Sequence, residues 1–130
     1  MEFTLKDIQT AHNKYTGPDF PKLIQEFKRM GMVANIYDLS GGMTQYVDKL
    51  GNRLESQGVE NKLLVADSPN VKEARAALRR NQAGTSDFPT FCQEMAEAGV
   101  YKWISDLEKM TCSYFDLQEN AIIVETIPSK

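Results

Sequence analysis

The sequence predicts an α+β protein made of two copies of one unit, in which two helices are followed by three strands. The stretch DFPTFCQEMAEAG, which begins at Asp87, nearly repeats DFPKLIQEFKRMG, which begins at Asp19. An ungapped alignment of residues 19–52 with residues 87–120 gives 12 identities in 34 positions. In both copies the apolar residues first recur at helical spacing and then alternate as they do in strands.

The identical pairs extend over the whole unit. They are Asp19/Asp87, Phe20/Phe88, Pro21/Pro89, Gln25/Gln93, Glu26/Glu94, Gly31/Gly99, Ile36/Ile104, Asp38/Asp106, Leu39/Leu107, Tyr46/Tyr114, Asp48/Asp116 and Asn52/Asn120. A shift of two residues also aligns Leu5 with Val71. One unit cannot bury its own apolar faces, whereas two units bury them against each other. We therefore predict a single domain of two repeats, residues 1–67 and 68–130, related by a pseudo-twofold axis, with the helices packed on antiparallel sheet.

Each repeat is expected to begin with two helices. Thr4 can cap the first helix, which Gly17-Pro18 ends, and the second runs from Asp19 to Gly31 with a proline in its first turn. In the second repeat, Ser68-Pro69-Asn70 precedes a helix over residues 71–82, and a fourth helix runs from Asp87 to about Ala98.

Three strands are expected after each helix pair. In the first repeat they are MVANIYDL from Met32, TQYVDKL from Thr44 and NKLLVAD from Asn61, with residues 51–60 as a longer excursion that can include a short strand. In the second repeat they are VYKWISDL from Val100, TCSYFDL from Thr111 and AIIVETI from Ala121. The order of the strands in the sheet does not follow from the sequence.

Composition narrows the classes of partner. The 130 residues are 42% apolar and 25% charged, as in a soluble globular domain, and the net charge of −3 gives no field to attract nucleic acid. The N-terminus lacks the pattern of a secretory signal, no apolar run is long enough for a membrane helix, and two cysteines are too few for a disulfide scaffold. We expect a cytoplasmic monomer or homodimer that has no cofactor, metal, nucleic-acid partner or membrane partner.

One stretch also resembles a known family. DFPTFCQEMAEAGVYKWISDLEKMTCSYFD, from Asp87, and the later IIVETIP are similar to the small bacterial and prophage proteins of the YbcV and YdfO type. That family is often labelled "phage envelope protein". The resemblance covers essentially the whole chain and is most specific between Asp87 and Pro128. It implies a small α+β protein with a domain of unknown function, and it carries over no catalytic residues.

Few side chains offer chemistry. His12, the single histidine, has no partners spaced for metal binding or acid–base work, so we expect it to be a partly buried helix residue. Cys92 stands where the first repeat has Ile24, which predicts a core thiol, and Cys112 stands where it has Thr44. Neither cysteine belongs to a C-x-x-C pair.

The repeated aspartates allow two interpretations. The pairs are Asp38/Asp106, Asp48/Asp116 and Asp19/Asp87. A twofold axis can bring two carboxylates together for acid–base chemistry. Alternatively, the first two pairs form turns beside hairpins and the third pair caps helices.

The first strand of each repeat has two different faces. The shared Ile36 and Ile104 are expected to face the helices, which would leave the aromatic residues on the other face. These are Tyr37, Tyr101 and Trp103, with Tyr46 or Tyr114 nearby. Such a face suits a ligand or a partner, although a second core layer or a homodimer contact fits the same pattern.

No nucleotide-binding, hydrolase or metalloprotease motif occurs. We therefore expect a non-enzymatic binding or accessory protein that uses the aromatic face. The alternatives are a small hydrolase or thiol enzyme built on the repeated aspartates or Cys92, and a structural component of a virion.

Overall fold

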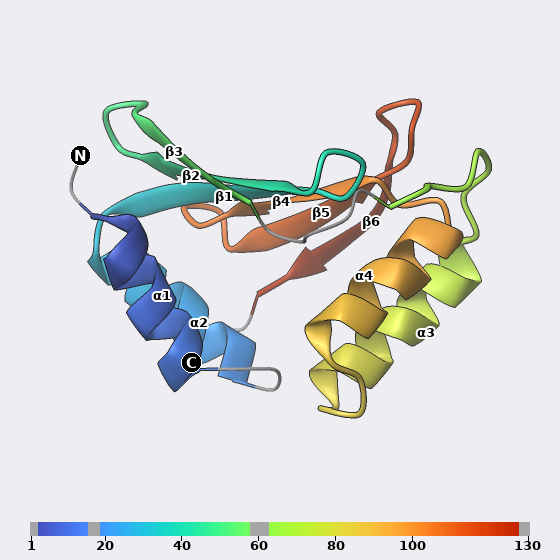
Figure 1. Ribbon diagram of the computed structural model, residues 1–130, viewed down its shortest axis with the longest axis horizontal. Helices are drawn as coiled ribbons and strands as arrows, with labels where there is room; N and C mark the ends of the chain where they lie inside the picture. The colour runs from blue at the N-terminus through green and yellow to red at the C-terminus, as the bar shows by residue number, and fades with distance from the viewer. Residues whose placement is uncertain (1–2, 16–18, 58–62, 128–130) are drawn as a thin grey trace.

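The protein has two layers, a sheet and the helices that cover one of its faces (Figure 1). The computed structural model describes residues 3–15, 19–57 and 63–127, and this part contains four helices and six strands. In chain order the elements are α1 (Leu5–Lys14), α2 (Phe20–Arg29), β1 (Met32–Asp38), β2 (Met43–Asp48), β3 (Arg53–Gln57), α3 (Val71–Gln82), α4 (Phe88–Glu97), β4 (Lys102–Asp106), β5 (Thr111–Phe115) and β6 (Ala121–Thr126). The predicted α+β fold of two α-α-β-β-β units is confirmed.

The two repeats share one antiparallel sheet, with strand order β3-β2-β1-β4-β5-β6. They meet where β1 pairs with β4, and Ile36 lies directly opposite Ile104. These isoleucines are counterparts in the two repeats, so the pseudo-twofold axis passes between them. The hydrogen bonds that extend this ladder obey the same symmetry, because Leu39 N donates to Tyr101 O (2.7 Å) and Leu107 N donates to Val33 O (3.0 Å).

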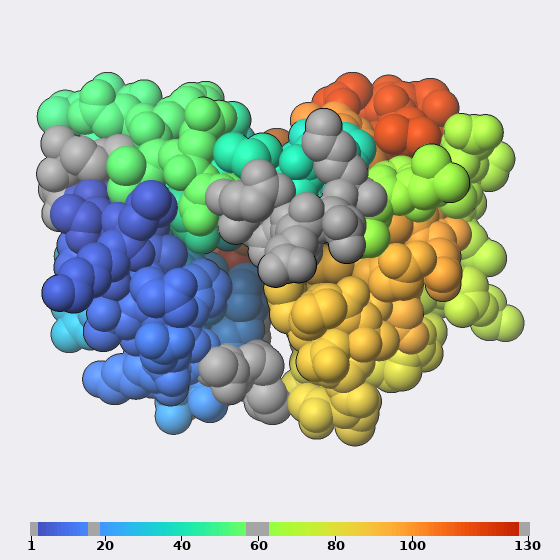
Figure 2. Space-filling model, viewed as in Figure 1, coloured from blue at the N-terminus to red at the C-terminus, as the bar shows by residue number. Residues whose placement is uncertain are grey.

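Each helix pair packs beneath its own half of the sheet. Figure 1 shows α1 and α2 under β1–β3, α3 and α4 under β4–β6, and α2 and α4 on either side of the midline. Phe27 of α2 contacts Tyr46 with ring centroids 6.3 Å apart, and Phe91 of α4 contacts Trp103 at 5.3 Å. In the space-filling view a furrow separates the two helical halves (Figure 2).

Helices α1, α3 and α4 begin with the predicted side-chain caps, whereas the predicted Asp19 cap of α2 is wrong. Thr4 and Asp7 form a reciprocal capping box at α1, and Asn70 accepts a hydrogen bond from Glu73 N at α3. Asp87 caps α4 by accepting from Thr90 N at 2.8 Å. Asp19 holds the same position at α2 but makes no side-chain hydrogen bond there.

The prediction of the third strand is wrong. Strand β3 instead lies at Arg53–Gln57 and pairs with β2, so the optional short strand within residues 51–60 is the one that forms. The described part of the predicted strand, residues 63–67, is not a strand, while residues 61 and 62 lie outside the described residues. This segment instead runs along α4, where Ala66 N donates to Ala96 O (2.9 Å). Its apolar side chains Leu63 and Val65 pack against the core, which explains why an apolar run here does not signal a strand.

Candidate functional site

The aromatic residues that the sequence singles out lie on the helix-covered face of the sheet. Tyr37 is 6% exposed and Trp103 is 8% exposed, whereas Ile36 and Ile104 are half-buried on the other face. The predicted assignment of the two faces is therefore wrong. Alternation along a strand separates two faces but does not say which one is covered, and here the larger aromatic rings take the buried side.

Three of the five predicted aromatic residues come together. Tyr37 and Trp103 are opposite each other in the β1–β4 ladder, and their rings stack with centroids 5.2 Å apart at an interplanar angle of 10°. Tyr114 lies 5.7 Å from Trp103. Helix α4 adds Phe88, 5.2 Å from Tyr37, and Phe91. We call these five residues, Tyr37, Phe88, Phe91, Trp103 and Tyr114, the aromatic cluster.

The other two predicted residues have different neighbours. Tyr46 packs edge-on against Phe27 under the first repeat. Tyr101 is half-buried, and Lys102 Nζ lies 5.2 Å from the centre of its ring. Tyr46 nevertheless lies near enough to Tyr37 to influence the pKa of its hydroxyl, so it adjoins the aromatic cluster.

The aromatic cluster reaches the surface through Phe88. This side chain is 43% exposed, although its ring packs at nearly right angles to both Tyr37 and Trp103. It is the first residue of α4, held there by the Asp87 cap and the following Pro89. Phe88 is not among the site residues predicted from the sequence, although the repeated tripeptide DFP marks it and its counterpart Phe20.

The hydroxyl of Tyr37 lacks a good partner. It is buried, and among the described residues its polar neighbour is the thiol of Cys92, which is a weak acceptor. Burial raises the pKa of Tyr37, and the neighbouring Cys92 and Tyr46 raise it further. A buried hydroxyl without a partner costs free energy that a bound acceptor would recover.

The two halves of the covered face differ in polarity. Asn35 and Ser105, which are opposite each other, are the repeat counterparts of Trp103 and Tyr37. Asn35 Nδ2 donates to Gln45 O at 3.1 Å, and Ser105 Oγ lies 3.5 Å from the sulfur of Cys112. On the covered face of the β1–β4 ladder, the Tyr37–Trp103 pair is therefore aromatic, and its symmetry-related pair, Asn35–Ser105, is polar.

The two thiols are buried, as the sequence predicts for Cys92. Burial raises the pKa of Cys92 to about 12 and also raises the pKa of Cys112. Both are therefore protonated at neutral pH, whereas a cysteine nucleophile reacts as the thiolate.

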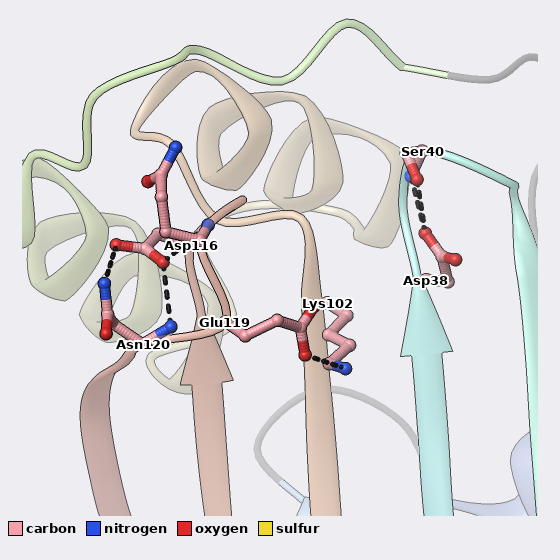
Figure 3. A network of polar contacts seen from close by, with 7 residues as sticks. Asp38, Ser40, Lys102, Asp116, Glu119 and Asn120 are labelled. Carbon is pink, nitrogen blue, oxygen red and sulfur yellow. Dashed lines mark hydrogen bonds and ion pairs between the residues drawn. The ribbon is translucent and has the colours of Figure 1, made fainter.

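The repeated strand-end aspartates act as turn formers. In the hairpin turns, Asp38 accepts from Ser40 N and Gly41 N, and Asp106 accepts from Glu108 N and Lys109 N, at 2.9–3.1 Å. Figure 3 shows the hydrogen bond between Asp38 and Ser40. It also shows Asp116 accepting hydrogen bonds from Asn120 in the turn between β5 and β6. The interpretation as turn residues is confirmed for these carboxylates.

The symmetry does not bring Asp38 and Asp106 together. Asp38 pairs with Lys102 and Asp106 pairs with Ala34, at opposite ends of the β1–β4 ladder. Four residues of strand separate them, or about 13 Å. The Asp48 carboxyl is buried, which by itself raises its pKa, but hydrogen bonds from Asn52 and Leu50 outweigh burial and lower it.

His12 is an exposed residue of α1, but its ring packs edge-on against Phe27, with centroids 5.6 Å apart, and the desolvation of the ring at this contact lowers its pKa. Among the described residues, no group of three His, Cys, Asp or Glu side chains is arranged to hold a metal ion. No described helix is long and apolar enough to cross a membrane.

Residues 9–126 match the model of the family DUF1398, described as a protein of unknown function. The chain belongs to this family. Relatives of this DUF1398 protein include the uncharacterized protein Rv2012 of Mycobacterium tuberculosis and Mb2035 of Mycobacterium bovis. Each is 34% identical over 126 residues, which covers 92% of this chain and 76% of the relative. The uncharacterized protein YcgX of Escherichia coli is 24% identical over 109 residues, which covers 84% of this chain and 81% of the relative.

Proposed function

We propose that this DUF1398 protein is a non-catalytic binding protein whose ligand is a small, flat, largely apolar molecule. The ligand lies against the aromatic cluster, between α2 and α4. The observation that carries this proposal is Phe88, which leaves 43% of its surface in solvent while packing on Tyr37 and Trp103. An exposed aromatic ring that continues into a buried aromatic stack offers a flat ligand one more ring to stack on.

The polar groups nearby suggest what else the ligand carries. The hydroxyl of Tyr37, whose neighbour is only the weakly accepting thiol of Cys92, suits a stronger hydrogen-bond acceptor at the edge of the ligand. The polar pair Asn35 and Ser105 lies beside it on the same face of the sheet. Few polar groups set among aromatic walls are typical of small-molecule sites. In this proposal Tyr114 packs against the stacked rings of Tyr37 and Trp103, and Tyr46 and Tyr101 lie at the border of the site.

Several features favour binding over catalysis. The carboxylates that a hydrolase would use are engaged in turns, and the pKa of Cys92 is raised to about 12. General acids and bases must instead be free to exchange a proton with substrate near the working pH. A small hydrolase or thiol enzyme therefore has no group among these in the required state.

The test uses Trp103, the single tryptophan, as a built-in reporter. The neutral fluorophore N-phenyl-1-naphthylamine would be titrated into the folded protein while energy transfer from Trp103 is recorded. We expect saturable transfer that weakens about fivefold in Phe88→Ser, since one aromatic contact contributes about 1 kcal/mol.

The matched control is Phe20→Ser, which removes the counterpart ring, itself 36% exposed, from the polar half. This variant should bind the probe as the wild type does. Absence of transfer in the native protein, or an equal loss in both variants, would contradict the proposal.

We further propose a bacterial or prophage setting, as the resemblance to the YbcV and YdfO type implies, and a cytoplasmic location, which the two cysteines, too few for a disulfide scaffold, favour. The bacterial relatives support the bacterial part of this setting. Light scattering of the pure protein measures the size of its assembly, which distinguishes an accessory protein from a structural component of a virion. A monomer or homodimer is expected, and a large regular assembly would favour the virion component.

A further inference from the structure

The outer side of α1 and α2 carries a hollow that is separate from the aromatic cluster. Its volume is about 510 Å³, and its lining consists of Tyr15, Lys22, Gln25, Glu26, Lys28 and Arg29. A second hollow of about 420 Å³ adjoins it, sharing Glu26 and Arg29 and adding Lys14 from α1. Together they form one depression, which we call the α1–α2 hollow. Its size suits a small molecule.

Positive charge dominates this hollow, although the whole chain has a net charge of −3. The carboxylate of Glu26 is paired with Arg29 of the same helix. Asp7, which also lines the hollow, accepts a hydrogen bond from Thr4 N in the capping box of α1. Within the described part of the chain, Lys14, Lys22 and Lys28 form no ion pair, so their charges are available to an anion.

The second repeat shows that the fold does not require these cations. The counterparts of Lys22, Lys28 and Arg29 on α4 are Thr90, Ala96 and Glu97. The helix positions are the same, and the neighbouring Gln25 and Glu26 are retained as Gln93 and Glu94. The positive charge is therefore a property of the first repeat alone.

The ion pair that joins the helices also differs between the repeats. In the second repeat, Arg80 of α3 binds Glu94 of α4 at 2.9 Å and ties the two helices together. The counterpart of Arg80 is Lys14, which instead lies over the ring of Tyr15, 5.3 Å from its centre. Because Glu26 is taken by Arg29, the corresponding bridge between α1 and α2 is not made.

We propose that the α1–α2 hollow binds a small molecule with at least two negative charges, such as a phosphate ester or a dicarboxylate. Lys22 and Lys28 of α2 line the larger hollow and supply the charge that holds the anion there, and Lys14 adds positive charge from the adjoining smaller hollow. The ring of Tyr15 forms an apolar part of the wall. Charge-assisted hydrogen bonds from several cations to one compact anion are the strong kind, which gives the site its selectivity for dianions.

The experiment replaces the three basic residues of α2 with the residues found at the corresponding positions of α4. The variant Lys22→Thr, Lys28→Ala, Arg29→Glu carries side chains that the second repeat already uses on the same helix. The matched control, Lys72→Thr, Arg75→Ala, Arg79→Glu, changes the charge of the chain equally at exposed positions of α3. Circular dichroism and the melting temperature verify that both variants fold.

Inorganic pyrophosphate and succinate serve as probes in calorimetric titrations at low salt. We expect saturable binding of at least one probe to the wild type, about tenfold or more weaker in the α2 variant and unchanged in the α3 control. Tighter binding of pyrophosphate assigns a phosphate ligand, and tighter binding of succinate assigns a carboxylate. No binding of either probe, or an equal loss in the two variants, overturns the proposal. Binding of the neutral fluorophore at the aromatic cluster should not change in either variant.

Discussion

Gly99 is a point of close backbone packing in the second repeat. It follows α4 with φ of 85°, and a Cβ at this position would lie 2.6 Å from both Pro69 Cα and Ser68 O. Both neighbours are backbone atoms that cannot rotate away. Gly51 has the same φ of 85°, but a Cβ there would have no atom within 4 Å. Substitution of Gly51 therefore measures backbone strain alone, whereas substitution of Gly99 adds a steric clash to the same strain.

We expect Gly99→Ala to lower the free energy of unfolding by about 3 kcal/mol or more, because the clash adds to the left-handed conformation. Gly51→Ala should lower it by about 1 kcal/mol, the cost of that conformation alone. Urea unfolding of both variants measures the difference. Equal losses would show that the Ser68–Pro69 segment does not press on Gly99.

Single residues also show what the sequence could predict. The burial of Cys92 follows from its match to Ile24, and the turn role of Asp38 follows from its place before Ser40-Gly41. The face of Trp103 could not be predicted, because a strand pattern is symmetric until the position of the helices is known. The exposure of Phe88 has the same cause, since it depends on where α4 begins relative to the sheet.

At the scale of elements, the starts of α2 and α4 form an internal comparison. Asp87 accepts a hydrogen bond from Thr90 N, whereas Asp19 caps nothing with its side chain. We expect Asp87→Ala to lower the melting temperature by a few degrees and Asp19→Ala to leave it nearly unchanged.

The effect of Asp87 should depend on pH. Hydrogen bonds from Thr90 lower the pKa of the Asp87 carboxyl in the folded protein. Its contribution is therefore complete above the unfolded pKa of about 3.9, and it disappears as the pH falls through the lower folded value. Thermal melts of wild type and Asp87→Ala should differ at pH 7 and converge in strong acid. A difference that persists in strong acid would contradict this role for the carboxylate.

The element boundaries were predictable where capping residues and glycines mark them, as at α1 and α3. Strand β3 was predictable only as an option within residues 51–60, because RLESQ is polar and short, and it becomes a strand by pairing with β2 at the edge of the sheet. The apolar segment that follows it packs along α4 instead. Tertiary contacts thus determine that residues 53–57, and not residues 63–67, form the third strand of the first repeat.

At the scale of the whole molecule, duplication explains both the architecture and its asymmetry. The backbone kept even unusual conformations, since Gly42 and Met110, which are counterparts, both have positive φ (66° and 56°). Gly51 and Glu119 form a second such pair. The side chains diverged instead, giving an aromatic half and a polar half on the covered face. The sequence could predict the repeat, whereas the division at residue 67 stays a prediction.

The two repeats meet at the Ile36–Ile104 pair, and an engineered disulfide between these two positions tests this arrangement directly. Because Leu39/Tyr101 and Leu107/Val33 are hydrogen-bonded pairs, alternation makes Ile36/Ile104 a non-hydrogen-bonded pair, with Cα atoms about 4.5 Å apart. That separation suits a disulfide. The native thiols are both buried and do not compete.

The measurement is the fraction of intramolecular disulfide formed by Ile36→Cys/Ile104→Cys under mild oxidation, read by mass spectrometry of the folded monomer. We expect nearly complete formation. Ile36→Cys/Ser113→Cys serves as the control, since its cysteines lie two strands, or about 10 Å, apart and should remain reduced. Failure of the first pair to close while the protein stays folded would contradict a sheet joined on the pseudo-twofold axis.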